Sequence, residues 1–336
     1  MNDTLLASAS RILWRLIKAE GANPDAIFLE AGLDTALINV ASARYPVENA
    51  RKAWHLAADC IQDPCFGIRA GLHWLPSDLH ALGYAFLAGR TLHTGLSRVV
   101  RYNEVVDQVI HFIVKEDDEH LILHYDNARK DLPDIPALED ARWSIILTMC
   151  RTAKPEGISP ARIDLTHSTM KCRKAYEDFY RCPVNYSQQQ SAIYFKRADV
   201  YETLTAVNTE VAQVNEKALI DYIDRLQEDD IQHKVARVIT ELMASGQLSD
   251  DKVAKALGLS SRTLQRKLSG DGTTFKQILE SVRKKLAMAY ISDERLSFSE
   301  ISFLLGFSEQ SSFSRAFKRW TGKSPTQIRQ QTSRYK

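Results

Sequence analysis

The sequence lacks several features that mark common classes of protein. It contains no run of about 18 apolar residues, which excludes an ordinary membrane-spanning helix. The first residues, Met1 to Thr4, include no basic start that leads into an apolar stretch, so no signal peptide is expected. We therefore expect a cytoplasmic protein without a membrane partner.

Cysteine is scarce, and its spacing matches no redox or zinc motif. No pair has the Cys-x-x-Cys spacing among the five cysteines, which are Cys60, Cys65, Cys150, Cys172 and Cys182. An odd number without such spacing favours reduced thiols over a disulfide framework, with Cys60 and Cys65 as small buried hydrophobic residues. A zinc site from Cys172, Cys182 and His167 has poor ligand spacing, so we expect no metal and no cofactor.

Motifs of the common enzyme classes are also missing. The sequence contains no Gly-x-Gly-x-x-Gly, no phosphate-binding loop, no His-Glu-x-x-His and no Gly-x-Ser-x-Gly. Carboxylates are plentiful, but no pair of them stands out. We therefore do not expect an enzyme, and a concealed activity in the N-terminal part is kept as the alternative.

What is present is an ordinary globular composition with an uneven charge. The 336 residues, 44% hydrophobic and 26% charged, predict a soluble protein of two domains. Residues 231–336 hold 19 Lys and Arg against 9 Asp and Glu, whereas residues 1–230 hold 25 against 33. A basic C-terminal part on an acidic body favours a polyanionic partner for that part. Chance and solvated surface charge are the alternative.

The first 200 residues predict an α+β domain, a small sheet packed with many helices. Residues 109–115 and 120–125 alternate in hydrophobicity and are joined by an acidic turn, which indicates a β-hairpin. Two further strands are expected at 162–166 and 192–195. Amphipathic or apolar patterns predict helices at about 5–20, 47–61, 94–108, 138–150 and 169–180.

A helix capped by Asn208 and ending near Leu226 is expected to close this domain. The polar run 227–230 predicts the boundary, giving domains of 1–226 and 227–336. Apolar residues in and before the helix follow the 3-4-3-4 spacing of a coiled-coil seam, namely Leu204, Val207, Val211, Val214 and Ala218. The seam is short, so it either packs on its own domain or forms a dimer interface.

From residue 227 onward the pattern is all helical, and it contains a helix-turn-helix at 248–268. Ser249 is a good N-cap, Gly258 suits the left-handed turn that ends the first helix, and Ser260 suits the cap of the second. With the apolar residues turned inward, the second helix presents three residues outward, namely Arg262, Gln265 and Arg266.

A second copy of the same pattern occupies 296–320. Ser297 and Glu300 predict a capping box, Gly306 the turn and Ser308 the cap of the next helix. The residues left outward are Gln310, Ser311, Ser314 and Arg315. The two turn glycines lie 48 residues apart, and one long helix at 277–292 is expected between the motifs. Two matching copies indicate DNA binding more specifically than one, because any three-helix bundle can imitate a single copy.

Residues 231–330 resemble the DNA-binding domain of the AraC/XylS family of bacterial regulators. The resemblance is carried by ISFLLGF at 301–307, FSRAFKR at 313–319 and GKSP at 322–325. It implies two recognition helices that read adjacent major-groove segments of double-stranded DNA, with base contacts from the seven outward residues of the two motifs. Arg suits guanine and Gln suits adenine. Expected phosphate contacts are Lys267, Lys276, Lys318, Arg319 and Lys323.

The N-terminal region resembles the arabinose-binding-like domain of ornithine-utilisation and virulence regulators in the same family. The similarity lies in 79–87, 91–102 and 179–183. It implies a domain that senses a small effector, forms a homodimer and alters contact with RNA polymerase, with activation or repression left open. A protein-interaction module without a small ligand is the alternative. Four ring-bearing residues have two interpretations: they line an effector pocket, or they belong to the ordinary core. These residues are Trp74, His80, Tyr84 and Phe86.

Overall fold

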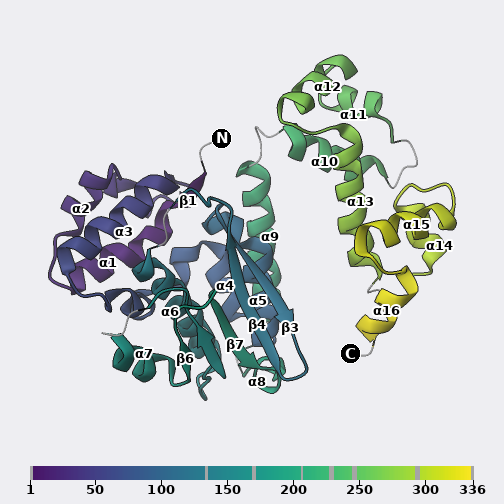
Figure 1. Cartoon of the computed structure of the whole chain (residues 1–336). Helices are drawn as coiled ribbons and strands as arrows, with labels where there is room; N and C mark the ends of the chain where they lie inside the picture. The colour runs from purple at the N-terminus through teal and green to yellow at the C-terminus, as the bar shows by residue number, and fades with distance from the viewer. Residues whose placement is uncertain are drawn as a thin grey trace. The chain divides into compact units, whose positions relative to one another are not determined.

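The computed structural model divides into two compact units, residues 1–223 and 224–336 (Figure 1). It describes residues 3–132, 135–168, 172–205, 207–226, 231–243, 248–291 and 296–333. The polar run at 227–230 lies outside these ranges, so the limits 1–226 and 227–336 stay a prediction. No helix in the described ranges is long and apolar enough to cross a membrane.

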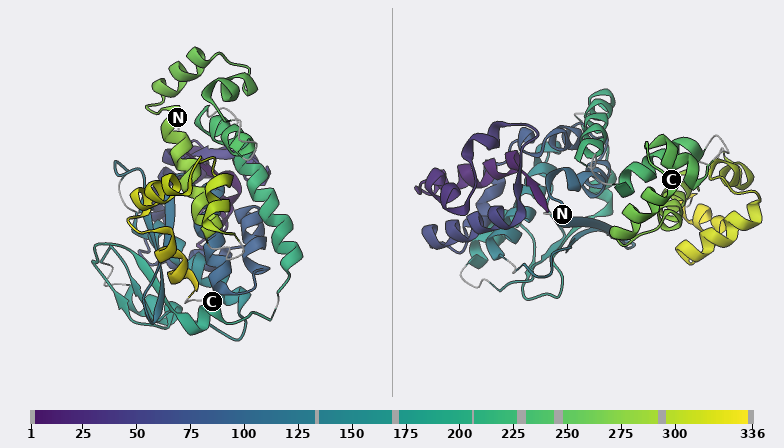
Figure 2. Two further views of the ribbon diagram at one scale, coloured as in Figure 1. Left: turned by 90° about the vertical axis from the view of Figure 1, so that its right-hand side faces the viewer. Right: turned by 90° about the horizontal axis from the view of Figure 1, so that it is seen from above.

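The first unit begins with a short strand where the sequence predicted a helix at 5–20. Residues Thr4–Leu6 form β1, which pairs antiparallel with β2, Arg44–Pro46, so the helix begins only with η1 and α1. The following elements are η1 Ala7–Ser10, α1 Arg11–Ala19, α2 Pro24–Ala31, η2 Thr35–Asn39 and α3 Val47–Ile61, the last as predicted. Helices α1 to α3 gather on one side of this unit (Figures 1 and 2).

The remaining helices of the N-terminal part follow along the chain, and the last of them, α9, extends three residues beyond the first unit. They are η3 Phe66–His73, η4 Pro76–Leu79, α4 Ala81–Leu87, α5 Leu92–Val106, α6 Pro136–Ala153, α7 Arg173–Tyr180, α8 Arg197–Tyr201 and α9 Thr209–Leu226. Two glycines allow η3 to lie directly on α6. A Cβ on Gly67 would come within 2.2 Å of the Ala137 carbonyl oxygen, and one on Gly71 within 2.5 Å of that of Ser144.

The predicted hairpin is confirmed and forms one edge of a five-stranded sheet. The strands are β3 Ile110–Glu116, β4 His120–Asn127, β5 Arg162–Asp164, β6 Val184–Asn185 and β7 Ala192–Lys196, in the order β3-β4-β7-β5-β6. Helix α6 packs on one face, where the Trp143 ring lies 5.6 Å from that of Tyr125 and 6.3 Å from that of Phe112, measured between centroids. The first unit is therefore α+β, as predicted.

The expectation of reduced thiols is wrong for one pair of cysteines. Cys65 and Cys172 form a disulfide that joins the start of η3 to the start of α7, with Cα atoms 5.3 Å apart and a sequence separation of 107. Spacing motifs cannot reveal a pair so distant in the chain. Cys60 is exposed and Cys65 half-buried, so neither is the buried hydrophobic residue expected. No cluster of three metal-ligating side chains occurs in the part of the chain that the structure describes.

Helix α9 packs on its own unit with a different face from the predicted seam. Asn208 caps it as expected, because its Oδ1 accepts a hydrogen bond of 3.0 Å from the Val211 amide. The buried residues are Ala212, Leu219 and Tyr222. Of the predicted seam residues in the helix, Val211 and Val214 are exposed. The three valines of the predicted seam, Val207, Val211 and Val214, therefore form an exposed apolar stripe, whereas Leu204 is buried and Ala218 half-buried.

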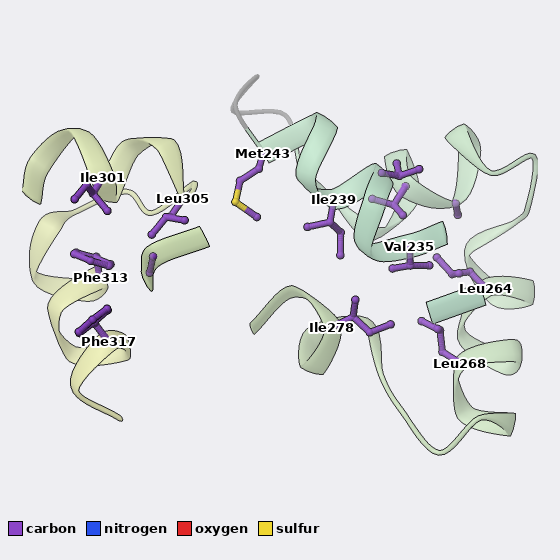
Figure 3. Close-up of a cluster of buried hydrophobic side chains, with 14 of the residues drawn as sticks. Val235, Ile239, Met243, Leu264, Leu268, Ile278, Ile301, Leu305, Phe313 and Phe317 are labelled. Atoms are coloured by element: carbon purple, nitrogen blue, oxygen red, sulfur yellow. The ribbon is translucent and has the colours of Figure 1, made fainter. Parts of the chain in front are cut away.

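The second unit consists of seven described helices around one apolar core. They are α10 Ile231–Met243, α11 Asp250–Ala256, α12 Ser261–Gly270, α13 Phe275–Ile291, α14 Phe298–Leu304, α15 Gln310–Thr321 and α16 Pro325–Ser333. Val235 and Ile239 of α10 meet Leu264 and Leu268 of α12 at one end of this core. At the other, aliphatic and aromatic side chains of α14 and α15 come together (Figure 3), namely Ile301, Leu305, Phe313 and Phe317.

Helix α13 is the long helix predicted between the two motifs. It begins at Phe275, two residues before the expected start, and Thr274 accepts a hydrogen bond of 3.3 Å from the Gln277 amide at that end. The side chain of Ala289 and all of Ser292, both part of the prediction, lie outside the described residues. Helices α11 and α12 lie toward one end of α13, and α14 and α15 toward the other (Figures 1 and 2).

Candidate nucleic-acid interface

The first motif has the caps and the turn that the sequence predicted. The Ser249 Oγ accepts a hydrogen bond of 3.2 Å from the Lys252 amide and begins α11. Gly258 has a φ of +68°, a left-handed conformation that glycine adopts without steric cost. The Ser260 Oγ then accepts 3.2 Å from the Thr263 amide and begins α12. Helix, turn and helix therefore follow from local signals alone.

Helix α12 has one buried face and one exposed face. Leu264 and Leu268, four residues apart, are buried in the core of the unit. The three predicted base-contacting residues, Arg262, Gln265 and Arg266, are all exposed. The predicted phosphate-contacting residues Lys267 and Lys276 are exposed as well. Their roles toward DNA stay predictions.

The second motif begins with the predicted capping box. The Ser297 Oγ accepts a hydrogen bond from the Glu300 amide at 3.2 Å, and Glu300 Oε2 accepts one from the Ser297 amide at 2.7 Å. The Ser297 hydroxyl and amide hydrogen bonds hold the pKa of Glu300 below its usual value. Gly306 has a φ of +67°, matching Gly258.

The predicted cap of the second recognition helix is wrong. Helix α15 begins at Gln310, so the capping position is Glu309 rather than Ser308, and no side chain caps it. The helix starts four residues after its turn glycine, whereas α12 starts three residues after Gly258. That extra residue moves Ser308 out of capping position.

Helix α15 also divides into a buried and an exposed face. Phe313 and Phe317 are fully buried. Of the predicted base-contacting residues, Gln310, Ser311 and Arg315 are exposed and Ser314 is half-buried. The predicted phosphate-contacting residues Lys318, Arg319 and Lys323 are exposed.

The predicted phosphate-contacting residues differ in their surroundings. The Arg319 guanidinium forms an ion pair with Glu280 of α13. Its positive charge is thus partly compensated within the protein, and a phosphate would have to compete with the Glu280 carboxylate. That pairing ties the recognition helix α15 to α13.

Sequence reasoning missed Arg283, which holds the second turn in place. Its Nε donates to the Leu305 carbonyl oxygen at 2.9 Å and its Nη2 to that of Gly306 at 2.8 Å. The guanidinium carbon also lies 4.3 Å from the centre of the Phe307 ring. Burial lowers the pKa of Arg283. The last carbonyls of any helix need donors, and this need is the one signal that could have directed attention to a basic residue on α13.

In the first unit, the four residues of the predicted effector pocket lie in different surroundings. Trp74 and Phe86 are buried, Tyr84 is 46% exposed, and the His80 ring packs on Tyr222 of α9 at 4.8 Å between centroids. None of the four lines the apolar cavity that the described residues of this unit enclose. Their part in effector binding stays a prediction.

Comparisons with known proteins agree with this division of the chain. Residues 21–204 match the family described as the arabinose-binding domain of AraC transcription regulators, N-terminal. Residues 253–331 match a helix-turn-helix domain. The chain belongs to the AraC family of transcription regulators. The resemblance predicted for each half of this AraC-family regulator is thereby confirmed.

Relatives of this AraC-family regulator include proteins from two bacterial genera. It is 25% identical to the ornithine utilization regulator of Pseudomonas aeruginosa, over 94% of this chain and 93% of that protein. It is 30% identical to the regulator VqsM of the same species, over 46% of this chain and 48% of VqsM. It is 35% identical to the regulator VirS of Mycobacterium tuberculosis, over 30% of this chain and 29% of VirS.

Among solved structures, the regulator CdpR from Pseudomonas aeruginosa covers 95% of this AraC-family regulator and 98% of its own chain. The sequence identity is 21% and the TM-score 0.46. The family matches thus define a DNA-binding transcription regulator with an arabinose-binding-like N-terminal domain.

Proposed function

We propose that this regulator reads two successive major-groove segments of double-stranded DNA with helices α12 and α15 of one chain. The observation that carries the proposal is that both helices bury an apolar face in one core and leave a polar face exposed. The exposed residues are Arg262, Gln265 and Arg266 on α12 and Gln310, Ser311 and Arg315 on α15, with the half-buried Ser314 beside the latter.

The chemistry of these residues suits base recognition. An Arg guanidinium pairs with the O6 and N7 of guanine through two hydrogen bonds, and a Gln amide pairs with the N6 and N7 of adenine. Lys267, Lys276, Lys318 and Lys323 supply positive charges for phosphates, which set the register and the salt dependence. Arg319 contributes less to this term because Glu280 already pairs with it.

The length of α13 fits two contacts on one side of the duplex. Its 17 residues span about 25 Å, and each recognition helix packs near one of its ends. Successive major-groove segments on one face of B-DNA are about 34 Å apart. We infer that α13, together with the width of the two motifs, sets the spacing of the two DNA elements.

For the N-terminal unit, we propose effector sensing and homodimerisation. The exposed apolar stripe formed by Val207, just before α9, and by Val211 and Val214 within it supports a dimer contact because its spacing suits a partner helix. An effector would shift the balance of dimer arrangements and so change contact with RNA polymerase. The name of one relative, an ornithine utilization regulator, places that protein in the control of a small-molecule pathway and suggests the same class of role here.

The second candidate is a regulator whose N-terminal unit only binds another protein. The stripe on α9 favours it as much as it favours the dimer. A thermal-shift screen separates the two, since a ligand that binds the folded state alone raises its apparent stability. If no amino acid, polyamine, sugar or organic acid raises the melting temperature, the result favours the protein-interaction module.

The DNA proposal is tested by selection of genome fragments with the purified full chain at two salt concentrations. We expect one recovered motif with two elements about ten base pairs apart. Binding that is strongly salt-sensitive and blind to sequence would contradict the assignment of α12 and α15 as reading helices.

A further inference from the structure

A partly open apolar cavity lies in the first unit. It has a volume of about 130 Å³ and is lined by residues of β1, η1, α1, α3, η4, α4, α5, β3 and α6. Its wall is mostly aliphatic and aromatic, with Ile12, Leu13, Trp54, Val99, Ile146 and Met149 among the lining residues. An apolar cavity of about 150 Å³ in a protein core accepts a benzene molecule. The space therefore suits a ligand whose apolar part has about six non-hydrogen atoms.

One end of the cavity is charged. Arg142 of α6 lines this cavity and also a smaller adjoining one of about 50 Å³. Its guanidinium is half-buried and lies over the Tyr125 ring at 5.1 Å, with the Tyr125 hydroxyl at 3.5 Å. Among the described residues, no carboxylate forms an ion pair with it. Asp107, which lines both cavities too, instead accepts hydrogen bonds from the Val109 and Ile110 amides at 2.8 and 3.4 Å.

A guanidinium at the edge of an apolar space has a clear chemical preference. Removing a positive charge from water is costly unless an anion and hydrogen bonds compensate it. A carboxylate does so best, because its two oxygens match the two parallel N–H groups of an arginine. A ligand with an ammonium group would place like charge beside Arg142, and the Asp107 carboxylate in the same wall already accepts hydrogen bonds from two backbone amides.

We propose that this cavity binds a small apolar monocarboxylic acid, whose hydrocarbon part fills the space while its carboxylate pairs with Arg142. The inference deepens the proposed effector-sensing role of the first unit and rests on it. The wall of the cavity also gives the ligand a route to the rest of the molecule. Helix α5 lines the space with Val99, Asn103 and Val106.

The same helix holds α9, the last helix before the DNA-binding unit. Glu216 of α9 accepts a hydrogen bond of 2.7 Å from the Tyr102 hydroxyl and pairs with Arg98 at 3.4 Å. A ligand that moves α5 therefore moves the surface on which α9 rests. Occupancy of the cavity should change DNA binding only to the extent that the ligand prefers one arrangement of these two helices.

The test is calorimetric titration of the full chain with three probes of equal length, hexanoate, hexan-1-ol and hexylamine. We expect hexanoate to bind about tenfold more tightly than hexan-1-ol because only the acid forms charge-assisted hydrogen bonds with Arg142. Hexylamine should bind more weakly than either. A wild-type chain that binds neither hexanoate nor hexan-1-ol would overturn the proposal.

Three variants locate the site. Arg142→Met keeps the apolar stem and should remove the preference for hexanoate while binding of hexan-1-ol persists. Ala141→Phe places a ring from a buried cavity-lining position into the space and should abolish binding of both. Arg173→Met, at an exposed arginine of α7, is the matched control and should bind as the wild type does. Circular dichroism checks that each variant folds, and Arg142→Met alone decides the acid preference if Ala141→Phe does not.

Unchanged hexanoate binding in both Arg142→Met and folded Ala141→Phe would place the acid elsewhere and overturn the proposal. The affinity for the selected operator, measured with the same proteins, separates this result from a failure of effector sensing. If a screened amine or sugar shifts operator affinity equally in wild type and Ala141→Phe, sensing stands and the cavity assignment falls. If hexanoate fills the cavity without any change in operator affinity, the site stands and its sensing role falls.

Discussion

The two helix-turn-helix motifs share a backbone plan but are stabilised by different side chains. Each has a serine cap at its first helix and a left-handed glycine at its turn. In the first motif, Ser260 caps the N-terminus of the recognition helix, and the buried side chains of that helix are leucines. The second has an uncapped recognition helix, an aromatic core and an arginine from α13 on its turn. The same geometry can thus be reached through local caps or through long-range packing.

The aromatic core of the second motif should give the largest effect. Phe313→Ala removes a fully buried ring and should lower the free energy of unfolding by about 3–5 kcal/mol, against about 2–5 kcal/mol for Leu264→Ala in the first motif. Urea titration measures both. Phe303→Ala, at a position that is 72% exposed on α14, is the control and should stay within about 0.5 kcal/mol of wild type. A larger loss from Leu264→Ala would reverse the comparison.

The arginine on the second turn should matter next. Arg283→Met removes the donors to the carbonyls of Leu305 and Gly306 and should cost about 1–3 kcal/mol of stability. Because the lost contacts belong to the second motif, binding to the matching operator element should suffer more than binding to the other. Footprinting of the two elements measures this. Lys284→Met, at the neighbouring exposed residue, is the control and should leave both DNA elements protected in the footprint.

The exposed arginines test the reading surfaces themselves. Arg266→Ala and Arg315→Ala should each lose about 1–3 kcal/mol of sequence-specific binding, each at a different operator element. Lys318→Ala should instead weaken binding to all DNA sequences alike. It should also reduce the slope of log affinity against log salt concentration by about one. Titrations with operator and unrelated DNA distinguish the cases. Wild-type affinity of either arginine variant for its operator would remove that residue from the interface.

Acid should affect the caps of the two motifs differently, and this effect should be the smallest. Hydrogen bonds from Ser297 lower the pKa of Glu300 in the folded state from its ordinary 4.5. Its contribution is therefore fully present above pH 4.5 and is lost as the pH falls through the lowered value. Ser249 caps α11 with Lys252 in the corresponding position, so that motif has no carboxylate that returns a hydrogen bond to the capping residue. Thermal unfolding of wild type and Glu300→Gln should differ most near pH 6, and the difference should shrink toward pH 3, because a protonated Glu300 is neutral like the glutamine. If the difference in stability between the two proteins does not change with pH, the pKa of Glu300 is the same in the folded and the unfolded chain.

Local signals explain most of what the sequence predicted correctly. The glycines at 258 and 306, the caps at Ser249, Ser260 and Ser297, and the helix at 47–61 all depend on neighbours in the chain. The hairpin at 110–127 likewise follows from its alternation and its acidic turn, where Asp117 accepts hydrogen bonds from two following amides. Exposed positions on the recognition helices followed from the same helical period.

The features that sequence reasoning missed depend on residues far apart in the chain. Thr4–Leu6 is a strand because β2 pairs with it. Arg283 reaches the carbonyls of Leu305 and Gly306 from another helix. The cavity beside Arg142 arises from the packing of helices and strands that lie between Leu5 and Met149 in the chain. Which of the exposed residues touch bases is a property of a complex, so those assignments stay predictions.

The disulfide between Cys65 and Cys172 makes the folded chain a closed ring with two tails. The ring includes α4, α5, α6 and the β3–β4 hairpin, so much of the wall around the apolar cavity lies within it. Such a cross-link acts chiefly on the unfolded chain, whose freedom it restricts by about 5 kcal/mol for a loop of about 100 residues in the chain-entropy model. A reducing buffer removes this restriction and should therefore make the first unit easier to unfold. The redox state of the preparation thus becomes a variable in any measurement of its stability.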